Sequence, residues 1–127
     1  MSSAAPDGPA ETSIVRRYFA AMDSGDLDAA LSFFSDDAIY IRSKIAAPDA
    51  PKAEGVEEMS GRDAIAAFFA LRGKRKTLHA IELEAKVDGH TWLEGRSTAG
   101  DNPSRYFLCH AQINDDGLIS RFLAIAG

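Results

Sequence analysis

The spacing of hydrophobic and polar residues changes along the chain from a helical period to strict alternation. Near the start, Val15, Tyr18, Phe19 and Met22 recur at intervals of three and four residues. This spacing places the four apolar side chains on one face of a helix. The pattern therefore predicts a first helix over residues 13–22 with one buried stripe.

A second helix is predicted over residues 27–34, where apolar residues again recur at helical spacing. The segment between the two helices contains Gly25, which suits a left-handed helix end, and Asp26, which suits the next N-cap. The chain therefore starts with two consecutive helices joined by a short turn.

The segment AIYIRS, residues 38–43, alternates in a way that predicts a strand. Ile39 and Ile41 share one face, which we expect to be buried. Tyr40 and Arg42 share the opposite face, and the surroundings of that face depend on the fold.

Residues 44–60 contain two prolines and a glycine without a clear period, which predicts a long loop. The helical period returns over residues 60–73, where Ile65, Phe68 and Phe69 form the apolar face of a third helix.

The remainder alternates and predicts four strands, over residues 77–87, 90–99, 105–113 and 118–126. The Asp-Gly pair at 88–89 is a strong signal for a tight hairpin turn. The order of elements predicts an α+β fold, with a meandering antiparallel sheet and the helices segregated to one side.

A chain of 127 residues fits one domain, which we place at residues 13–127. Residues 1–12 are rich in Ala, Ser and Pro and are expected to be a disordered leader. They contain no basic segment followed by an apolar one, so they do not resemble a secretory signal.

The net charge of −5 argues against nucleic acid as a partner, since phosphate binding needs clustered basic residues. The one basic cluster, between Arg72 and Lys76, is short and is interpreted as a solvated loop. No apolar run reaches 18 residues, so no membrane span is predicted. A single cysteine, Cys109, allows no internal disulfide and fits a cytoplasmic protein.

Three segments resemble a known family: RRYFAAMDSGDLDAALSFFSDDAIY, then SGRDAIAAFF, then NDDGLISRFLAIAG. They are similar to the SnoaL-like and ketosteroid-isomerase-like branch of the NTF2-like superfamily, over nearly the whole chain from residue 13. The resemblance implies an NTF2-like (cystatin-like) cone, in which a curved, mostly antiparallel sheet wraps around three N-terminal helices and encloses a pocket. Its members include isomerases, polyketide cyclases, epoxide hydrolases, dehydratases and non-catalytic binding modules, so fold alone does not settle function.

The resemblance extends to three functional positions of ketosteroid isomerases. Tyr18 matches the tyrosine that donates a hydrogen bond to the developing enolate. Arg42 stands in place of the general-base aspartate, and Cys109 in place of a second, protonated aspartate. An arginine cannot act as the base because its pKa exceeds about 12. The sequence therefore argues against a steroid isomerase of the Tyr/Asp/Asp type.

Two interpretations of Arg42 remain open. Its guanidinium group could hold a ligand anion or an oxyanion, or it could form a structural ion pair with Glu94 or an acidic loop residue. Glu94 shares a strand face with Trp92. If that face points inward, Glu94 is the best replacement general base; if it points outward, it forms a cross-strand ion pair.

The candidate catalytic residues are thus Tyr18, Arg42 and Glu94. Aromatic and small side chains that suit the wall of an apolar pocket are the candidate substrate-binding residues. They are Phe34, Tyr40, Phe69, Trp92, Phe107 and Cys109. Cys109 is also consistent with a buried, inert thiol. No spacing typical of a metal site and no phosphate-binding loop is present, so neither metal nor cofactor is expected.

Members of the family commonly dimerise through the outer face of the sheet, so the resemblance implies a homodimer. His110 and Gln112 point away from Cys109 and are candidates for that contact. The first functional hypothesis is a cofactor-independent SnoaL-like cyclase, isomerase or dehydratase that acts on a small apolar or anionic organic ligand. The alternative is a non-catalytic binding or dimerisation module.

Overall fold

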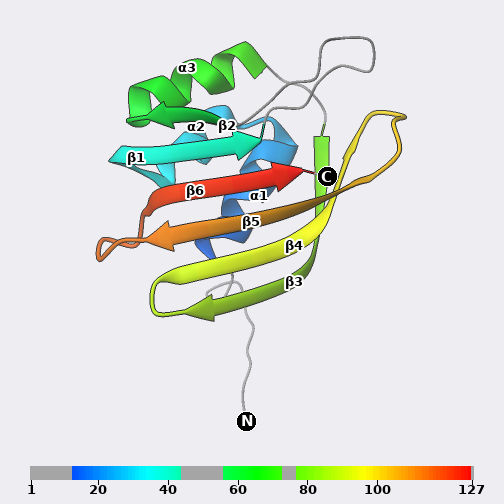
Figure 1. Ribbon diagram of the computed structural model, residues 1–127. Helices are drawn as coiled ribbons and strands as arrows, with labels where there is room; N and C mark the ends of the chain where they lie inside the picture. Colours follow the sequence, from blue (N-terminus) through cyan, green and yellow to red (C-terminus); the bar gives the residue numbers. More distant parts are fainter. Residues whose placement is uncertain (1–12, 44–55, 73–76, 127) are drawn as a thin grey trace.

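The computed structural model describes residues 13–43, 56–72 and 77–126, which form a mixed α+β fold (Figure 1). The helices are α1 (Ile14–Ser24), α2 (Leu27–Ser32) and α3 (Arg62–Arg72). The strands are β1 (Phe34–Ser43), β2 (Val56–Ser60), β3 (Thr77–Val87), β4 (His90–Ala99), β5 (Arg105–Ile113) and β6 (Ile119–Ala126). The predicted leader and most of the predicted loop lie outside the described residues. Within these ranges, no helix is long and apolar enough to cross a membrane.

The six strands form one open, curved sheet in the order β2-β1-β6-β5-β4-β3. Neighbouring strands are antiparallel except β1 and β6, which are parallel. In Figure 1, α1 and α2 lie behind the sheet and α3 lies beside β1 and β2, while the face towards the viewer is uncovered. The predicted α+β class with a largely antiparallel sheet is confirmed.

Helix α1 forms as its sequence pattern predicts. The hydroxyl of Ser13 accepts a hydrogen bond from the Arg16 backbone N–H at 3.1 Å and caps the helix. All four residues of the apolar stripe are buried in the core against the sheet. Full burial of an apolar side chain stabilises a fold by roughly 1.5–3 kcal/mol, so this stripe is a main anchor of the helix.

The boundary between α2 and β1 differs from the prediction. Helix α2 ends at Ser32 instead of continuing to Phe34, and β1 begins at Phe34 instead of Ala38. Phe34 pairs with Ile119 of β6 and is completely buried. Phe34 continues the helical pattern in the sequence but begins a central strand in the structure. Its pairing with a distant strand overrides the local helical periodicity.

A second difference concerns the predicted loop over residues 44–60. Its last five residues form β2, an edge strand that pairs with β1. Every residue of β2 is exposed or only half-buried, so its sequence lacks the apolar alternation that marks a strand.

The two faces of β1 are the reverse of the burial expected from its isoleucines. Tyr40 is buried with 5% of its surface exposed, whereas Ile39 and Ile41 are only half-buried. Tyr40 packs against rings of α3 and β6, at 5.5 Å from Phe68 and 5.0 Å from Phe122. The face that carries Tyr40 and Arg42 therefore points to the helices, and the isoleucine face belongs to the outer side of the sheet.

A bend in the sheet places the start of β3 near α1. The pairing of β3 with β4 shifts register between Ile81 and Leu83, as in a β-bulge. Gly95 of β4 lies opposite, and a Cβ at this position would come within 2.2 Å of the Ala80 carbonyl oxygen. In Figure 1 the first part of β3 turns sharply away from the rest of the strand. This bend brings residues at the start of β3 over the helices.

The outer face of the sheet is rich in apolar side chains. Large exposed examples are Leu83, Trp92, Tyr106 and Leu108. His110 lies among them, but only 8% of its surface is exposed. We refer to the side of the sheet that carries these residues as the outer face.

Candidate functional site

A cleft of about 420 Å³ opens on the helix side of the sheet, bordered by residues of α1, α3 and all six strands. This volume falls within the range of small-molecule sites. The buried part of the lining is aromatic and includes Tyr18, Tyr40 and Phe107, whereas Arg42 and Arg105 are more exposed. The cleft thus has an apolar interior and a charged rim.

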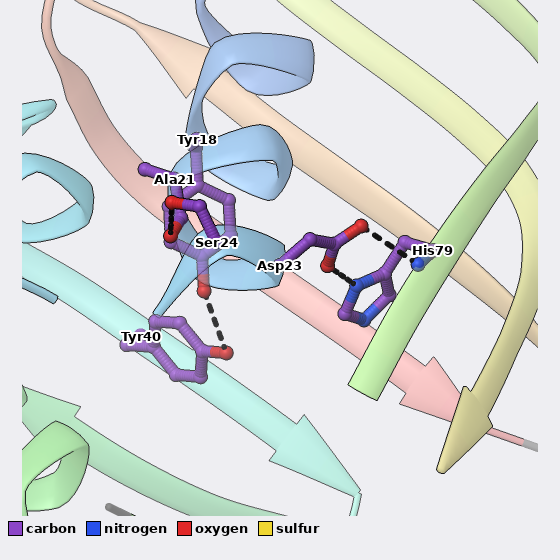
Figure 2. Close-up of polar contacts among 6 residues, drawn as sticks. All are labelled: Tyr18, Ala21, Asp23, Ser24, Tyr40 and His79. Carbon is purple, nitrogen blue, oxygen red and sulfur yellow. Dashed lines mark hydrogen bonds and ion pairs between the residues drawn. The ribbon is translucent and has the colours of Figure 1, made fainter. Parts of the chain in front are cut away.

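Two tyrosine hydroxyls meet inside the cleft. The Tyr18 oxygen of α1 lies 3.3 Å from the Tyr40 oxygen of β1 (Figure 2). Both side chains are nearly completely buried. Tyr18 reaches this place from the buried stripe of α1, and Tyr40 from the helix-facing side of β1. A pair of buried phenols can donate a hydrogen bond to an oxygen atom of a ligand.

Asp23 and His79 form a second polar pair at the cleft, shown in Figure 2. The Asp23 Oδ1 atom lies 2.6 Å from His79 Nδ1, and the Oδ2 atom accepts the His79 backbone N–H at 2.9 Å. An ionised carboxylate only accepts hydrogen bonds, so the proton on the ring must reside on Nδ1. In the neutral ring, Nε2 then carries the basic lone pair.

The end of α1 explains how Asp23 reaches this position. Gly25 adopts a left-handed conformation, and its N–H bonds to the Met22 carbonyl at 3.1 Å. The Ser24 hydroxyl bonds to the Ala21 carbonyl at 2.9 Å, which is also drawn in Figure 2. The helix therefore ends at Ser24, which places Asp23 in its last turn. A carboxylate is disfavoured at this end of a helix dipole, so the two hydrogen bonds with His79 offset an unfavourable placement.

Aromatic rings hold the His79 imidazole in place. Its ring centroid lies 4.6 Å from that of Phe19 and 5.5 Å from that of Phe107. Only 11% of the His79 side chain is exposed. The ring is thus fixed by packing on its faces and by Asp23 at one nitrogen, as a catalytic base requires.

Arg42 also lines the cleft, near the C-terminal end of β1. Its Nη1 atom lies 3.9 Å from Glu57 Oε1, and its guanidinium carbon lies 5.1 Å from the centre of the Phe68 ring. Glu57 stands opposite Arg42 in the pairing of β1 with β2. The acidic partner is therefore Glu57, not Glu94.

The structure brings together some of the residues predicted as a site. Tyr18, Tyr40, Arg42 and Phe107 line the cleft. Phe34, Phe69 and Cys109 are buried in the core outside the lining. Burial raises the pKa of the Cys109 thiol well above its usual range, so this thiol stays protonated.

The interior position considered for Glu94 and Trp92 is wrong. Both side chains are exposed, and 55% of the Trp92 surface is accessible. The buried residues of β4 alternate with them, so they point to the outer face. Glu94 is thus on the opposite side of the sheet from the cleft, and Trp92 is not part of its aromatic wall.

Asp23 and His79 are not among the residues predicted as a site. They are separated by 56 positions, and neither stands out in its own segment. One local signal existed: a carboxylate in the last turn of a helix with no basic residue beside it is unfavourable, and this indicates a partner elsewhere. In the described ranges, no group of three or more His, Cys, Asp or Glu side chains is placed to hold a metal ion.

Residues 15–122 match the family model of the SnoaL-like domain. The chain belongs to the SnoaL-like family. No curated protein matches it. Solved structures share the fold of this SnoaL-like chain at low sequence identity, which supports the fold alone.

Three of these structures illustrate the likeness. A proposed ketosteroid isomerase from Kribbella flavida is 16% identical with a TM-score of 0.68, covering 90% of this chain and 75% of its own. An NTF2-like protein of unknown function from Burkholderia xenovorans is 16% identical with a TM-score of 0.70, covering 90% and 80%. The epoxide hydrolase/cyclase-like enzyme SalBIII is 15% identical with a TM-score of 0.68, covering 90% and 88%.

Proposed function

We propose that this SnoaL-like protein is a cofactor-independent acid–base enzyme acting on a small, apolar, oxygenated molecule in the cleft. Its reaction would be an isomerisation, cyclisation or dehydration. The observation that carries the proposal is His79, which is paired with Asp23 and lines the same cleft as the paired hydroxyls of Tyr18 and Tyr40. A base and an oxyanion-binding group are the two parts that proton abstraction beside a carbonyl needs.

In the proposed mechanism, the substrate oxygen accepts hydrogen bonds from Tyr18 and Tyr40. His79 Nε2 takes the proton from the carbon next to the carbonyl group, and the tyrosines stabilise the enolate that forms. Asp23 keeps the proton on Nδ1 and stabilises the imidazolium. His79 then returns the proton to another atom of the substrate, so no group is gained or lost in an isomerisation.

The proposal does not include a steroid isomerase of the Tyr/Asp/Asp type. By the family resemblance, Arg42 and Cys109 match the two positions where such an enzyme has aspartates. Neither can serve as the base, because Arg42 keeps its proton and burial holds the pKa of Cys109 high. The proposed base comes instead from β3, a strand on which no catalytic residue was expected.

Exchange of carbon-bound hydrogen tests this function without knowledge of the natural substrate. Small cyclic ketones such as 2-tetralone are incubated in D₂O, and loss of the α-proton signal is followed by NMR. We expect wild type to accelerate exchange above buffer, and His79→Gln to lower this acceleration by about 10²- to 10⁴-fold. Tyr40→Phe should lower it by about 10²-fold, because it removes one donor.

His90→Gln provides the matched control. His90 is a half-buried histidine that is not part of the cleft lining, and its substitution should leave exchange at the wild-type rate. If wild type does not accelerate exchange of any ketone, or if His79→Gln matches wild type, the cleft is a binding site without this chemistry.

A further inference from the structure

Arg42 makes few close polar contacts with the rest of the described protein. Only 34% of its side chain is exposed, yet its ion-pair distance to Glu57 is 3.9 Å, beyond hydrogen-bond range. Among the described residues, no hydrogen bond from its guanidinium group is found, and its other contact is the face of the Phe68 ring. Its N–H donors thus remain available to solvent or to an acceptor on a ligand.

Arg96 shows what a satisfied arginine looks like in the same fold. It also pairs with a glutamate and lies over an aromatic ring, but on the outer face. Its Nε atom is 3.1 Å from Glu82, and its Nη2 atom donates to the Tyr106 hydroxyl at 3.2 Å. Its guanidinium carbon lies 5.0 Å from the Tyr106 ring centre. Arg96 is more exposed than Arg42 and still makes the closer polar contacts.

The cationic groups of the cleft are both arginines. Arg42 and Arg105 contribute two guanidinium groups to the lining, and Glu57 contributes one carboxylate. The Asp23 carboxylate beside His79 adds a second negative charge, so the charges around the cleft balance and the positive charge is confined to the two arginines. An anionic group of a ligand would therefore be attracted to a guanidinium group itself.

The contact between Arg42 and Phe68 also leaves the guanidinium group its hydrogen-bonding capacity. A cation–π contact with the face of a ring uses none of the N–H donors, which stay available to a planar acceptor. A carboxylate is the planar acceptor that matches the guanidinium fork with two parallel hydrogen bonds. The buried aromatic lining suits the apolar body of the same molecule.

We propose that Arg42 binds a carboxylate of the substrate, so that the cleft takes small apolar organic acids. This inference rests on the proposed function, because it assigns the substrate class of the same site. The acid group lies against Arg42 at the rim, the apolar body lies along the aromatic lining, and the reacting carbon lies near Tyr18 and His79. Glu57 competes with the ligand for Arg42 and limits its affinity.

A matched pair of probes tests this proposal by isothermal titration calorimetry. The two ligands are 2-naphthoate and its neutral amide, 2-naphthamide, which share shape and apolar surface. Wild type is expected to bind the carboxylate about 10- to 100-fold more tightly than the amide, as for a charge-assisted hydrogen bond. Arg42→Gln should remove this preference by weakening only carboxylate binding.

Two further variants make the result specific. Arg96→Gln removes the matched arginine of the outer face and should leave both affinities unchanged. Glu57→Gln removes the competing carboxylate and should tighten naphthoate binding about threefold, a change of less than 1 kcal/mol.

Three results would overturn the proposal: no binding of naphthoate to wild type, equal affinities for the two probes, or a preference that survives Arg42→Gln. Because these are binding measurements, they can fail while ketone exchange succeeds, and the reverse also holds. The two proposals are therefore tested separately.

Discussion

Asp23 and His79 show why candidate functional residues are hard to find from this sequence. In the segment TLHAI, alternation places His79 on the same face as Ile81, but it indicates neither a partner nor a role for the histidine. In the structure Leu78 is 58% exposed, whereas only 11% of the His79 side chain is accessible. The bend of β3 and the contact with α1 decide this orientation, and both are long-range.

Tyr18 could be predicted for the opposite reason. Its place on a strong helical stripe required burial. The family resemblance matched it to a tyrosine that donates a hydrogen bond to an enolate. The burial of Tyr40 was harder to predict, because the neighbouring Ile39 and Ile41 are more apolar and were expected to take the buried face. The choice between the two faces of β1 depends on the rings of α3 and β6.

The outer-face residue His110 forms a tightly connected group. Its Nε2 atom lies 2.8 Å from His90 Nδ1, and Arg121 of β6 lies 3.5 Å from its Nδ1 atom. The Trp92 ring packs at 4.3 Å. Burial lowers the pKa of His110, and the neighbouring His90 and the Arg121 cation lower it further. A proton added to Nδ1 of His110 would face the positive charge of Arg121.

The lowered pKa makes stability depend on pH in a defined direction. Just below pH 6.5, the ordinary pKa of histidine, the unfolded chain takes up a proton at His110 that the folded chain does not. The free energy of unfolding should therefore fall as pH drops from about 7 through this range. We expect His110→Gln to reduce this slope, measured by urea unfolding at a series of pH values. A slope equal to that of wild type would show that His110 does not contribute.

At the scale of elements, turns and helix ends could be predicted while long-range pairings could not. The Asp-Gly hairpin at 88–89 has both residues in the left-handed region, as the sequence indicates. Gly25 ends α1 and Asp26 caps the start of α2, and both act locally. By contrast, β2 is defined only by its partner β1. The sequence of an exposed edge strand contains little information about that pairing.

Gly95 is the element-scale feature on which the position of His79 depends. The Ala80 carbonyl oxygen occupies the space that a Cβ would need, at 2.2 Å. We expect Gly95→Ala to lower the free energy of unfolding by about 1–3 kcal/mol, as in other overpacked sites. The measurement is denaturant unfolding followed by circular dichroism.

Gly100→Ala is the comparison for this prediction. Gly100 has a positive φ of 58° but open space around it, so its substitution costs only the left-handed backbone, about 1 kcal/mol. If Gly95→Ala is no more destabilising than Gly100→Ala, the close approach to Ala80 does not constrain the strand.

At the scale of the whole molecule, the outer face is the main uncovered apolar surface of the described sheet. Trp92, Tyr106 and Leu108 are each more than half exposed on it. Exposed apolar patches of this kind are typical of interaction sites. The expected homodimer through this face, with His110 and Gln112 near the contact, stays a prediction that the single chain does not test.

Substitution of one exposed leucine tests the dimer. Leu108→Glu changes a residue that is 55% exposed in the single chain, so it should alter the stability of the subunit by less than about 0.5 kcal/mol. We expect sedimentation velocity to show a dimer for wild type and a monomer for Leu108→Glu. Leu71→Glu, on α3 and 87% exposed, is the control and should remain dimeric. A monomeric wild type, or a Leu108→Glu variant that remains dimeric, would contradict the prediction.

The parallel pairing of β1 with β6 also has a consequence for protein synthesis. β1 is among the first elements to leave the ribosome, but its central neighbour in the sheet extends to residue 126. The cleft-lining tyrosine of β1 therefore remains without the Phe122 ring that packs on it until the last strand is made. The nascent chain exposes an aromatic strand until β6 is made, so we expect folding of this domain to wait for its last strand and to be sensitive to chaperones.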